Sequence, residues 1–498
     1  MAITLTDNQR DAVYAEAPVL VSAAAGSGKT AVLTQRVLRL LTDDKNPVPA
    51  DRLLIVTFTK AAASEMKERI SSALRSALKN EPDNRLLRRQ RTLLPKAKIC
   101  TIDSYCQDFV KRYFHILGIS PNMRIIDDDR REALRRRAVN DCIEEYFAAG
   151  DSDFIKLLRF LAADNPEQIF KIIFSLSHFL SSLAFDDEWV EKVKGMYIAA
   201  DLAKAPWVHT VLSTAGQRLA AAHAMLHRAI AKMEGDEKLQ KAYLSAFTSA
   251  MQEIGDMADM AQQDDWNGLY ASLSEFKFPQ TEQVRGHKDK AFAESIKSAK
   301  SDADEIVKEV KELISCDIET AAEDVRRLAP AINKLFEVTK RYNLILSEYK
   351  HEIGGLDFSD IEHLALSLLV KRENGDIMLT DIANEEAKRY DEVLIDEYQD
   401  VNDLQDTLVY ALSGGGKRLF MVGDVKQSIY RFRQSEPGIF LKKRTDYKAN
   451  DRAGCRYIVL DENFRSRSGI CEAVNFFFSR LMTKESGEMD YTSDDGLI

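Results

Sequence analysis

Short apolar runs alternate with helix-like segments near the start of the chain. The runs at residues 52–59 and 97–102 have the length and continuous hydrophobicity of strands that are buried on both faces of a parallel sheet. An earlier run ends at Ala23, and residues 31–41 and 60–74 have the character of helices. This alternation predicts an α/β fold built on a parallel sheet.

Residues 108–351 have a different pattern, with long charged and alanine-rich segments and apolar residues at helical spacing. Neither strand alternation nor a fixed repeat is visible there. Strand-like runs return at residues 390–395, 418–424 and 457–460. The pattern therefore predicts a parallel sheet interrupted by a large all-helical insertion.

The first strand runs into a segment of small residues that precedes a helix. Small residues allow backbone N–H groups to curl around a polyphosphate at the helix N-terminus. The lysine of this segment can reach the outer phosphates, and the threonine hydroxyl can hold Mg²⁺. The predicted phosphate loop consists of Ala23, Ala24, Ala25, Gly26, Ser27, Gly28, Lys29 and Thr30. It predicts a P-loop NTPase (RecA-like) domain, but Ala23 stands where the motif usually has glycine, and an ordinary glycine turn before a helix is the alternative.

Two adjacent carboxylates, Asp396 and Glu397, follow the strand predicted at residues 390–395. One carboxylate can hold Mg²⁺ through water, and its neighbour can orient and deprotonate the water that attacks a γ-phosphate. With a phosphate loop upstream, paired acids at the end of an apolar strand predict hydrolysis of a nucleoside triphosphate. The alternative is an acid-rich helix N-terminus without a catalytic role.

Several polar and aromatic residues have two interpretations. Gln9 has the donors and acceptors that reading an adenine edge requires, but alone it is more typical of an ordinary surface residue. Phe58 and Tyr105 follow predicted strands and are either core aromatics or platforms on which single-stranded bases stack. The stretch from Gln427 to Arg433 combines a polar sensor with aromatic residues and arginines.

The composition narrows the class of protein. With 498 residues and 45% hydrophobic composition, the chain is expected to form about two to four domains. Its net charge of −10 means that nucleic-acid binding depends on a local basic and aromatic surface. The six scattered cysteines argue against a zinc ribbon, a redox pair or a disulfide scaffold. No apolar run approaches the ~20 residues that span a bilayer, and the N-terminus is unlike a secretion signal, so we expect a cytoplasmic protein without a membrane partner.

The order of these motifs resembles that of superfamily 1A helicases of the UvrD, Rep and PcrA group. The series comprises Gln9, the phosphate loop and residues 57–59, 396–400, 423–430 and 463–466. The stretches at residues 356–366, 422–433 and 463–467 are similar to the AddA (or RexA) family of helicase–nuclease subunits.

This resemblance implies an enzyme that uses ATP and Mg²⁺ and translocates 3′→5′ on DNA. With a second subunit of the AddB or RexB type, it would process double-strand ends for recombinational repair. Gln9 would read adenine, Arg36 and Phe464 would lie against the base, Asp396 would bind the metal, and Glu397 would be the catalytic base. The residues expected at the γ-phosphate are Gln427, Arg433 and Arg465. Those expected at single-stranded DNA are Thr57, Phe58, Thr59, Thr101, Tyr430 and Phe432.

Three positions depart from the family pattern. Lys60 stands where asparagine is common, Asp103 where histidine is usual and Val401 where threonine is usual. A carboxylate at position 103 would repel DNA phosphates, which puts the usual DNA contact at this position in question.

By the same resemblance, residues 1–107 and 352–439 form motor domain 1A, residues 108–351 form the helical insertion 1B, and residues 440–498 begin a second motor domain 2A. The chain stops at Ile498, before the later helicase motifs and the nuclease domain of the family. We therefore expect this chain to bind ATP but to unwind DNA poorly by itself. Two other functions stay open, namely a phosphate-loop NTPase or nucleotide kinase that does not act on DNA, and a non-catalytic nucleotide-binding scaffold.

Overall fold

The computed structural model describes residues 5–162, 166–198 and 205–498. The chain divides into two compact units, one formed by Met1–Asp187 with Glu337–Ile498 and the other by Glu188–Phe336. The first unit contains the sheet and the residues predicted to bind ligands. Each unit is described by itself below.

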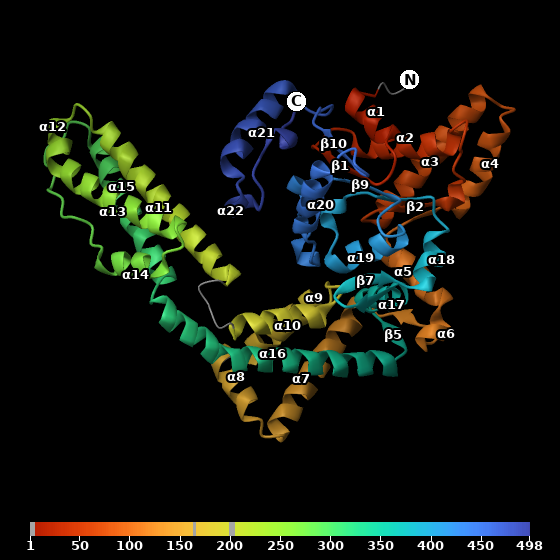
Figure 1. Ribbon diagram of the computed structural model, residues 1–498, viewed down its shortest axis with the longest axis horizontal. Helices are drawn as coiled ribbons and strands as arrows, with labels where there is room; N and C mark the ends of the chain where they lie inside the picture. The colour runs from red at the N-terminus through yellow and green to blue at the C-terminus, as the bar shows by residue number, and fades with distance from the viewer. Residues whose placement is uncertain (1–4, 163–165, 199–204) are drawn as a thin grey trace. The chain divides into compact units, whose positions relative to one another are not determined.

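The described residues of the first unit form a six-stranded sheet in the order β10-β1-β9-β8-β2-β3. Every neighbouring pair in this sheet is parallel, which confirms the predicted fold class. Figure 1 shows strands from the start of the chain (red and orange) beside strands from its end (blue). The strands are β1 (Val19–Ala23), β2 (Leu53–Val56), β3 (Lys98–Cys100), β8 (Glu392–Ile395), β9 (Leu419–Gly423) and β10 (Arg456–Leu460).

The side chains of the central strands alternate between two hydrophobic cores, one on each face of the sheet. Leu54 and Val56 belong to one core, while Leu53 and Ile55 belong to the other. The second core is covered by α1 (Asp7–Tyr14), α2 (Lys29–Thr42), α3 (Lys60–Asn80) and α4 (Arg85–Leu93). The first is covered by α5 (Ile102–Arg112), α17 (Phe358–Leu369), α18 (Asp381–Ala387), α19 (Asp403–Leu412) and α20 (Pro437–Ala449). Burial on both faces explains why the strands read as continuous apolar runs.

The register places the functional segments at one edge of the sheet. Val56 pairs with Ile395, and Ser22 pairs with Gly423. The phosphate loop, the residues after β2 and the acidic pair after β8 therefore all leave the sheet at its carboxyl edge, where ligands bind in open α/β folds.

Strand β10 belongs to this first sheet, because its residues pair in parallel with β1 from Val19↔Arg456 to Ala23↔Leu460. Helix α20 contributes the buried Phe440 to the core beneath the sheet. The sequence analysis began a second motor domain at residue 440, but the sheet of the first domain extends to Leu460. The sequence could not show this, because the apolar character of a strand does not indicate which sheet it joins.

The remaining described elements of the first unit are short or helical. They are α6 (Phe114–Leu117), α7 (Asp128–Ala148), α8 (Ser152–Ala162), α9 (Pro166–Leu180), α21 (Ser468–Leu481), α22 (Lys484–Gly487), the pairs β4 (Arg124–Ile125) with β5 (Gly355–Leu356) and β6 (Val370–Glu373) with β7 (Asp376–Leu379), and the 3₁₀ turns η1 (Ala50–Arg52), η2 (Leu94–Lys96), η5 (Tyr398–Asp400), η6 (Val425–Gln427), η7 (Arg431–Arg433) and η8 (Ser493–Asp495). Helices α10 (Asp186–Tyr197) and α16 (Ile318–Glu352) run across the boundaries between the units.

The described residues of the second unit form helices joined by loops, the longest at residues 276–289, and contain no strand. This agrees with the helical insertion that the sequence predicted. Its helices are α11 (Pro206–Lys232), α12 (Glu237–Leu239), η4 (Gln240–Leu244), α13 (Ser245–Gln262), α14 (Trp266–Glu275) and α15 (Lys290–Leu313). Apolar residues at helical spacing on α13, among them Phe247 and Ile254, are buried in the hydrophobic core of this unit. Their spacing is therefore explained by the packing of helices against one another.

Of the helices in the described part of the chain, none combines the length and the apolar character that crossing a bilayer requires.

Candidate functional site

The phosphate loop joins β1 to α2 through two glycines in the left-handed region. Gly26 has φ 75° and Gly28 has φ 85°, conformations that are open to glycine without steric cost. Gly28 is the N-cap of α2, and no side chain among the described residues caps this helix. The N-terminal N–H groups of α2 are therefore available to an anion, and the helix dipole favours one.

Lys29 is the first residue of α2 and lies against the acidic pair. Its Nζ is 3.1 Å from Oε2 of Glu397 and 3.5 Å from Oε1 of Gln427. Glu397 has a left-handed backbone, φ 53°, which turns the chain sharply as it leaves β8. Three residues that are far apart in the sequence thus converge within reach of one phosphate group.

Asp396 occupies the end of β8, where its N–H donates to the carbonyl of Val56 at 3.0 Å. Its Oδ1 accepts from the N–H of Glu397 at 3.1 Å. Burial and the neighbouring Glu397 carboxylate raise the pKa of Asp396 to about 6, while the charge of Lys29 opposes this increase. A carboxyl group with this pKa is mostly ionised at neutral pH and able to bind a cation.

Helix α1 and the segment after β10 support the phosphate loop. Gln9 is buried, and its Nε2 donates to the carbonyl of Ser27 at 2.9 Å while its Oε1 accepts from the N–H of Thr6. Asn463 Nδ2 donates to the carbonyl of Ala25 at 2.7 Å, and the N–H of Phe464 donates to the carbonyl of Gly26. The next residue, Arg465, is exposed beside this loop, and so is the ring of Phe464.

An aromatic cluster lies beside the acidic pair at the same edge. The rings of Phe58 and Tyr430 are 4.4 Å apart, and those of Tyr430 and Phe432 are 5.7 Å apart. Arg433 lies over all three rings, 5.3 Å from the centre of Phe58. Phe432 is 69% exposed while Phe58 and Tyr430 are half-buried, so the cluster presents one exposed ring to solvent. Tyr105, in contrast, is a core residue, and its hydroxyl donates to Glu386.

The threonines predicted at DNA have local structural partners. Thr59 accepts from the N–H of Ala62 and caps α3, and Thr101 accepts from the N–H of Ser104 and caps α5. Thr57 is buried and donates to the carbonyl of Thr59. The two caps stabilise the first turns of α3 and α5, which begin close to the aromatic cluster.

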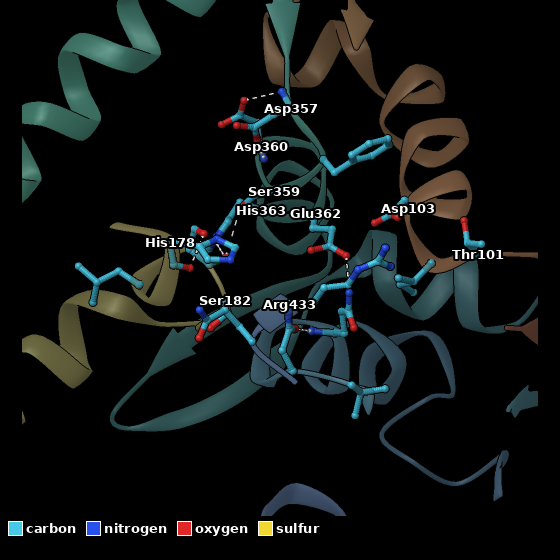
Figure 2. Close-up of a pocket in the computed structure, with 18 of the residues that line it drawn as sticks. Thr101, Asp103, His178, Ser182, Asp357, Ser359, Asp360, Glu362, His363 and Arg433 are labelled. Carbon is cyan, nitrogen blue, oxygen red and sulfur yellow. Dashed lines mark hydrogen bonds between the residues drawn. The ribbon is translucent and has the colours of Figure 1, made fainter. Parts of the chain in front are cut away.

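A cavity of about 840 Å³ opens between the carboxyl edge of the sheet and helices α7, α9, α16 and α17. The aromatic residues Phe58 and Phe432 line it together with Thr101 and Asp396. Figure 2 shows its polar floor, where Asp103 of α5 and Glu362 of α17 lie beside one another near Arg433. The cavity is thus continuous with both the acidic pair and the aromatic cluster.

A protein-family profile described as the UvrD/REP helicase N-terminal domain matches residues 5–448. The chain belongs to the UvrD/REP helicase family. The family implies ATP binding, which agrees with the phosphate loop. The match covers the helical insertion and all strands of the sheet except β10, which follows residue 448.

Several relatives have names that describe them as one subunit of an ATP-dependent helicase/nuclease. The protein of Acetivibrio thermocellus is 34% identical over 505 residues, which cover 99% of this chain and 40% of the relative. That of Geobacillus thermodenitrificans is 36% identical over 501 residues, covering 98% of this chain and 40% of the relative. That of Thermoanaerobacter sp. is 34% identical over 508 residues, covering 100% of this chain and 41% of the relative. This helicase domain therefore spans about 40% of the length of the relatives that it matches.

Two arginines of this helicase domain lie away from the places that the resemblance implied. Arg36 is completely buried, and its guanidinium donates to Glu392 and to the carbonyls of Ala12 and Ala15. Arg36 is therefore inaccessible to a nucleotide base, and its hydrogen bonds connect α1 to strand β8 of the sheet. Arg433 lies with the aromatic cluster and the cavity instead of with Lys29.

The sequence analysis missed a polar network behind the acidic pair. Gln399 Nε2 donates to Oε2 of Glu397 at 2.9 Å, and Gln399 Oε1 accepts from the N–H of Asp424 at 2.9 Å. Asp424 in turn accepts from Gln427 Nε2 at 2.7 Å. Gly423 permits this approach, since a Cβ there would lie 2.5 Å from Oε1 of Gln399. The sequence signals that could have indicated this network are Gly423 at the end of an apolar strand and Gln399 in the acidic segment.

Proposed function

We propose that this chain binds ATP with Mg²⁺ and is the ATP-binding portion of a 3′→5′ DNA translocase and helicase. The observation that carries the proposal is the convergence of Lys29, Asp396 and Glu397 beside a phosphate loop at the carboxyl edge of one sheet. Family membership supports the same assignment.

The nucleotide would occupy the phosphate loop, with its outer phosphates at Lys29. Lys29 now donates to Glu397, so phosphate oxygens would take over the ammonium group when the nucleotide binds. Glu397 would then be free to orient and deprotonate the attacking water. Gln399 holds one oxygen of Glu397 and leaves the other available for that water. Gln427 and the exposed Arg465 would contact the γ-phosphate.

Magnesium fits the donors present at this site. Within the described residues, no group of three or more histidine, cysteine or acidic side chains could hold a metal alone. Mg²⁺ commonly binds through one or two carboxylates together with substrate phosphates and water. Asp396 would supply the carboxylate and Thr30 a hydroxyl, and the ion would neutralise charge on the phosphates.

Single-stranded DNA would stack on the aromatic cluster formed by Phe58, Tyr430 and Phe432, where base stacking contributes about 1–3 kcal/mol per base. The chain as a whole is negatively charged, and Arg433 supplies a local positive charge beside the rings. Gln427 and Tyr430 lie three positions apart in one short segment. A displacement of Gln427 when the γ-phosphate leaves would therefore reach the ring of Tyr430 directly.

The names of the relatives suggest the wider role. We propose that this helicase domain acts in a helicase–nuclease complex with a second subunit of the AddB or RexB type, on double-strand ends that enter recombinational repair.

Three variants of the 498-residue chain test the proposal through binding of a fluorescent ATP analogue and hydrolysis of ATP with an oligothymidylate. Lys29→Ala should weaken ATP binding at least about tenfold, because the phosphates lose a charge-assisted contact. Glu397→Gln should bind ATP at least as tightly as the wild type, since it frees Lys29, but should hydrolyse it about 10²–10⁴-fold more slowly. Glu65→Gln, on the exposed face of α3, is the matched control.

Unchanged hydrolysis by Glu397→Gln would refute the assigned base. Hydrolysis that the oligothymidylate never stimulates would favour an NTPase that does not act on DNA. Binding of ATP without hydrolysis in the wild type would favour a non-catalytic nucleotide-binding scaffold.

A further inference from the structure

Glu362 is a buried acid on the floor of the cavity that the proposed reaction does not use. It lies on α17, and its Oε1 accepts from Nε2 of Gln405 on α19 at 2.9 Å. The carboxyl group of Asp103, at the start of α5, lies beside that of Glu362. Both acids line the cavity that also contains Phe58 and Arg433 (Figure 2).

Two carboxyl groups in contact can hydrogen bond with each other only if one of them keeps its proton. Gln405 donates to one oxygen of Glu362, so a proton on Glu362 would let this side chain also donate to the neighbouring Asp103 carboxylate. Ionisation of both acids would bring two like charges together in a buried place.

We propose that Glu362 and Asp103 share one proton at neutral pH, and that Glu362 is thereby a positioning residue that limits the negative charge facing a DNA strand in this cavity. The inference rests on the proposed function, because it assumes that single-stranded DNA passes the aromatic cluster.

The direction of the titration agrees with this arrangement. Burial and the carboxylate of Asp103 raise the pKa of Glu362 to about 8, while the hydrogen bond from Gln405 opposes the increase. Burial also raises the pKa of Asp103, while the hydrogen bond from Glu362 and the charges of Arg433 and Lys60 lower it. Glu362 therefore keeps the proton and Asp103 carries the charge.

The other charged groups around the pair fix its electrostatic effect. Arg433 from η7 and Lys60 from α3 face Asp103, and Asp357 of α17 adds negative charge near Glu362. Asp357 and its neighbour Asp360 are bound to Lys350 of α16, and the Cys106 thiol of α5 stays protonated because burial raises its pKa. The cavity is also lined by Arg131 and Arg135 of α7 and by Asp396, Glu397 and Asp400 at the edge of the sheet, so loss of the shared proton adds one negative charge to a lining that contains both signs.

This arrangement explains how the chain tolerates an acid at position 103. The departure from histidine predicted repulsion of DNA phosphates at this point. A neutral Glu362 that donates to Asp103 holds that carboxylate against α17, and Arg433 and Lys60 offset its remaining charge.

The test measures binding of a fluorescent oligothymidylate to the 498-residue chain as pH is raised from about 6.5 to about 9.5. We expect the wild-type affinity to fall about three- to tenfold as the pair loses its proton near about pH 8, because one added charge then lies within a Debye length of the strand. Glu362→Gln keeps a neutral donor of the same shape, so its affinity should match that of the neutral wild type and change little with pH. Glu385→Gln, an exposed acid on α18, should keep the wild-type profile.

Unfolding in urea tests the shared proton without DNA. In the unfolded chain Glu362 loses its proton near its ordinary pKa of 4.5, and in the folded chain it does so near about 8. The folded state therefore binds one more proton between these values, so wild-type stability should fall relative to that of Glu362→Gln as pH rises through this window. The difference should stay constant above it.

These two measurements separate the possible failures. A pH-dependent difference in unfolding with a flat DNA-binding profile would overturn the proposal, because the pair would then have only a structural role. A flat difference in unfolding would overturn the shared proton itself. If the wild type bound oligothymidylate at no pH, the proposed DNA-binding function would fail, whereas a pH-dependent unfolding difference would still support the shared proton.

Discussion

Replacing Arg36 distinguishes a structural role from contact with the nucleotide base. In Arg36→Met, the carboxylate of Glu392 loses its partner at 2.5 Å, and the carbonyls of Ala12 and Ala15 lose donors at 2.9 and 2.8 Å. Glu392 is only 6% exposed, so water cannot replace the guanidinium. Removing one partner of a buried ion pair costs about 3–5 kcal/mol. Since domains are stable by about 5–15 kcal/mol, this variant should lose a large part of its stability.

A double variant separates the ion pair from the hydrogen bonds to the carbonyls. Glu392→Gln removes the charge that Arg36→Met leaves without a partner, so Arg36→Met with Glu392→Gln should be more stable than Arg36→Met alone by about 1–3 kcal/mol. The double variant should remain less stable than the wild type, because the carbonyls at the end of α1 still lack their donors.

The assay is urea unfolding of the four proteins, together with the ratio of ATP to GTP affinity measured at low temperature on folded protein. We expect the unfolding midpoint to fall and the affinity ratio to stay unchanged. If Arg36→Met unfolded within about 1 kcal/mol of the wild type but lost its preference for ATP, the burial argument would be wrong and Arg36 would contact the base.

Two further predictions concern the acidic pair and the network behind it. Burial and Glu397 raise the pKa of Asp396 to about 6, so a proton competes with Mg²⁺ below that pH. Mg²⁺-dependent binding of ATP should weaken by up to about tenfold per pH unit below about 6, and Asp396→Asn should abolish this dependence; a wild-type Mg²⁺ titration unchanged down to about pH 5 would contradict it. Gly423→Ala places a Cβ 2.5 Å from Oε1 of Gln399, so hydrolysis should fall while ATP binding persists. Gly469→Ala, where a Cβ meets nothing within 4 Å, is its control, and equal hydrolysis by the two variants would show that Gln399 does not position Glu397.

The sheet and the phosphate loop could be predicted because their signals are local. Apolar runs that are buried on both faces, and small residues before Lys29, depend on neighbouring residues alone. Parallel strands bring their carboxyl ends to one edge, so Asp396 and Glu397 could be expected near Lys29 from topology. The structure brings Lys29 and Glu397 within 3.1 Å of each other.

Other features depend on which distant segments pack together, and the sequence pattern does not contain that information. Arg36 was assigned to the base from its place in a motif, but its burial depends on Glu392 and the end of α1, which lie far from it in the sequence. The strand at residues 456–460 has the same apolar character whichever sheet it joins. Asp103 departs from the family pattern, but its neighbour Glu362 lies 259 positions later in the chain and could not be paired with it from the sequence.

The polar network at the carboxyl edge connects the proposed nucleotide site with the segment that carries the proposed DNA-binding rings. Glu397 is held by Lys29 and by Gln399, and Gln399 is held by Asp424, whose carboxylate also binds Gln427. Loss of any one of these contacts leaves a polar group without its partner, so the members of the network depend on one another. Under the proposed function, a phosphate that bound Lys29 would replace the contact with Glu397 and compete for Gln427. Gln427 precedes Tyr430 by only three residues, so under the proposed function a shift of Gln427 would be transmitted through this short segment to a ring on which a DNA base would stack.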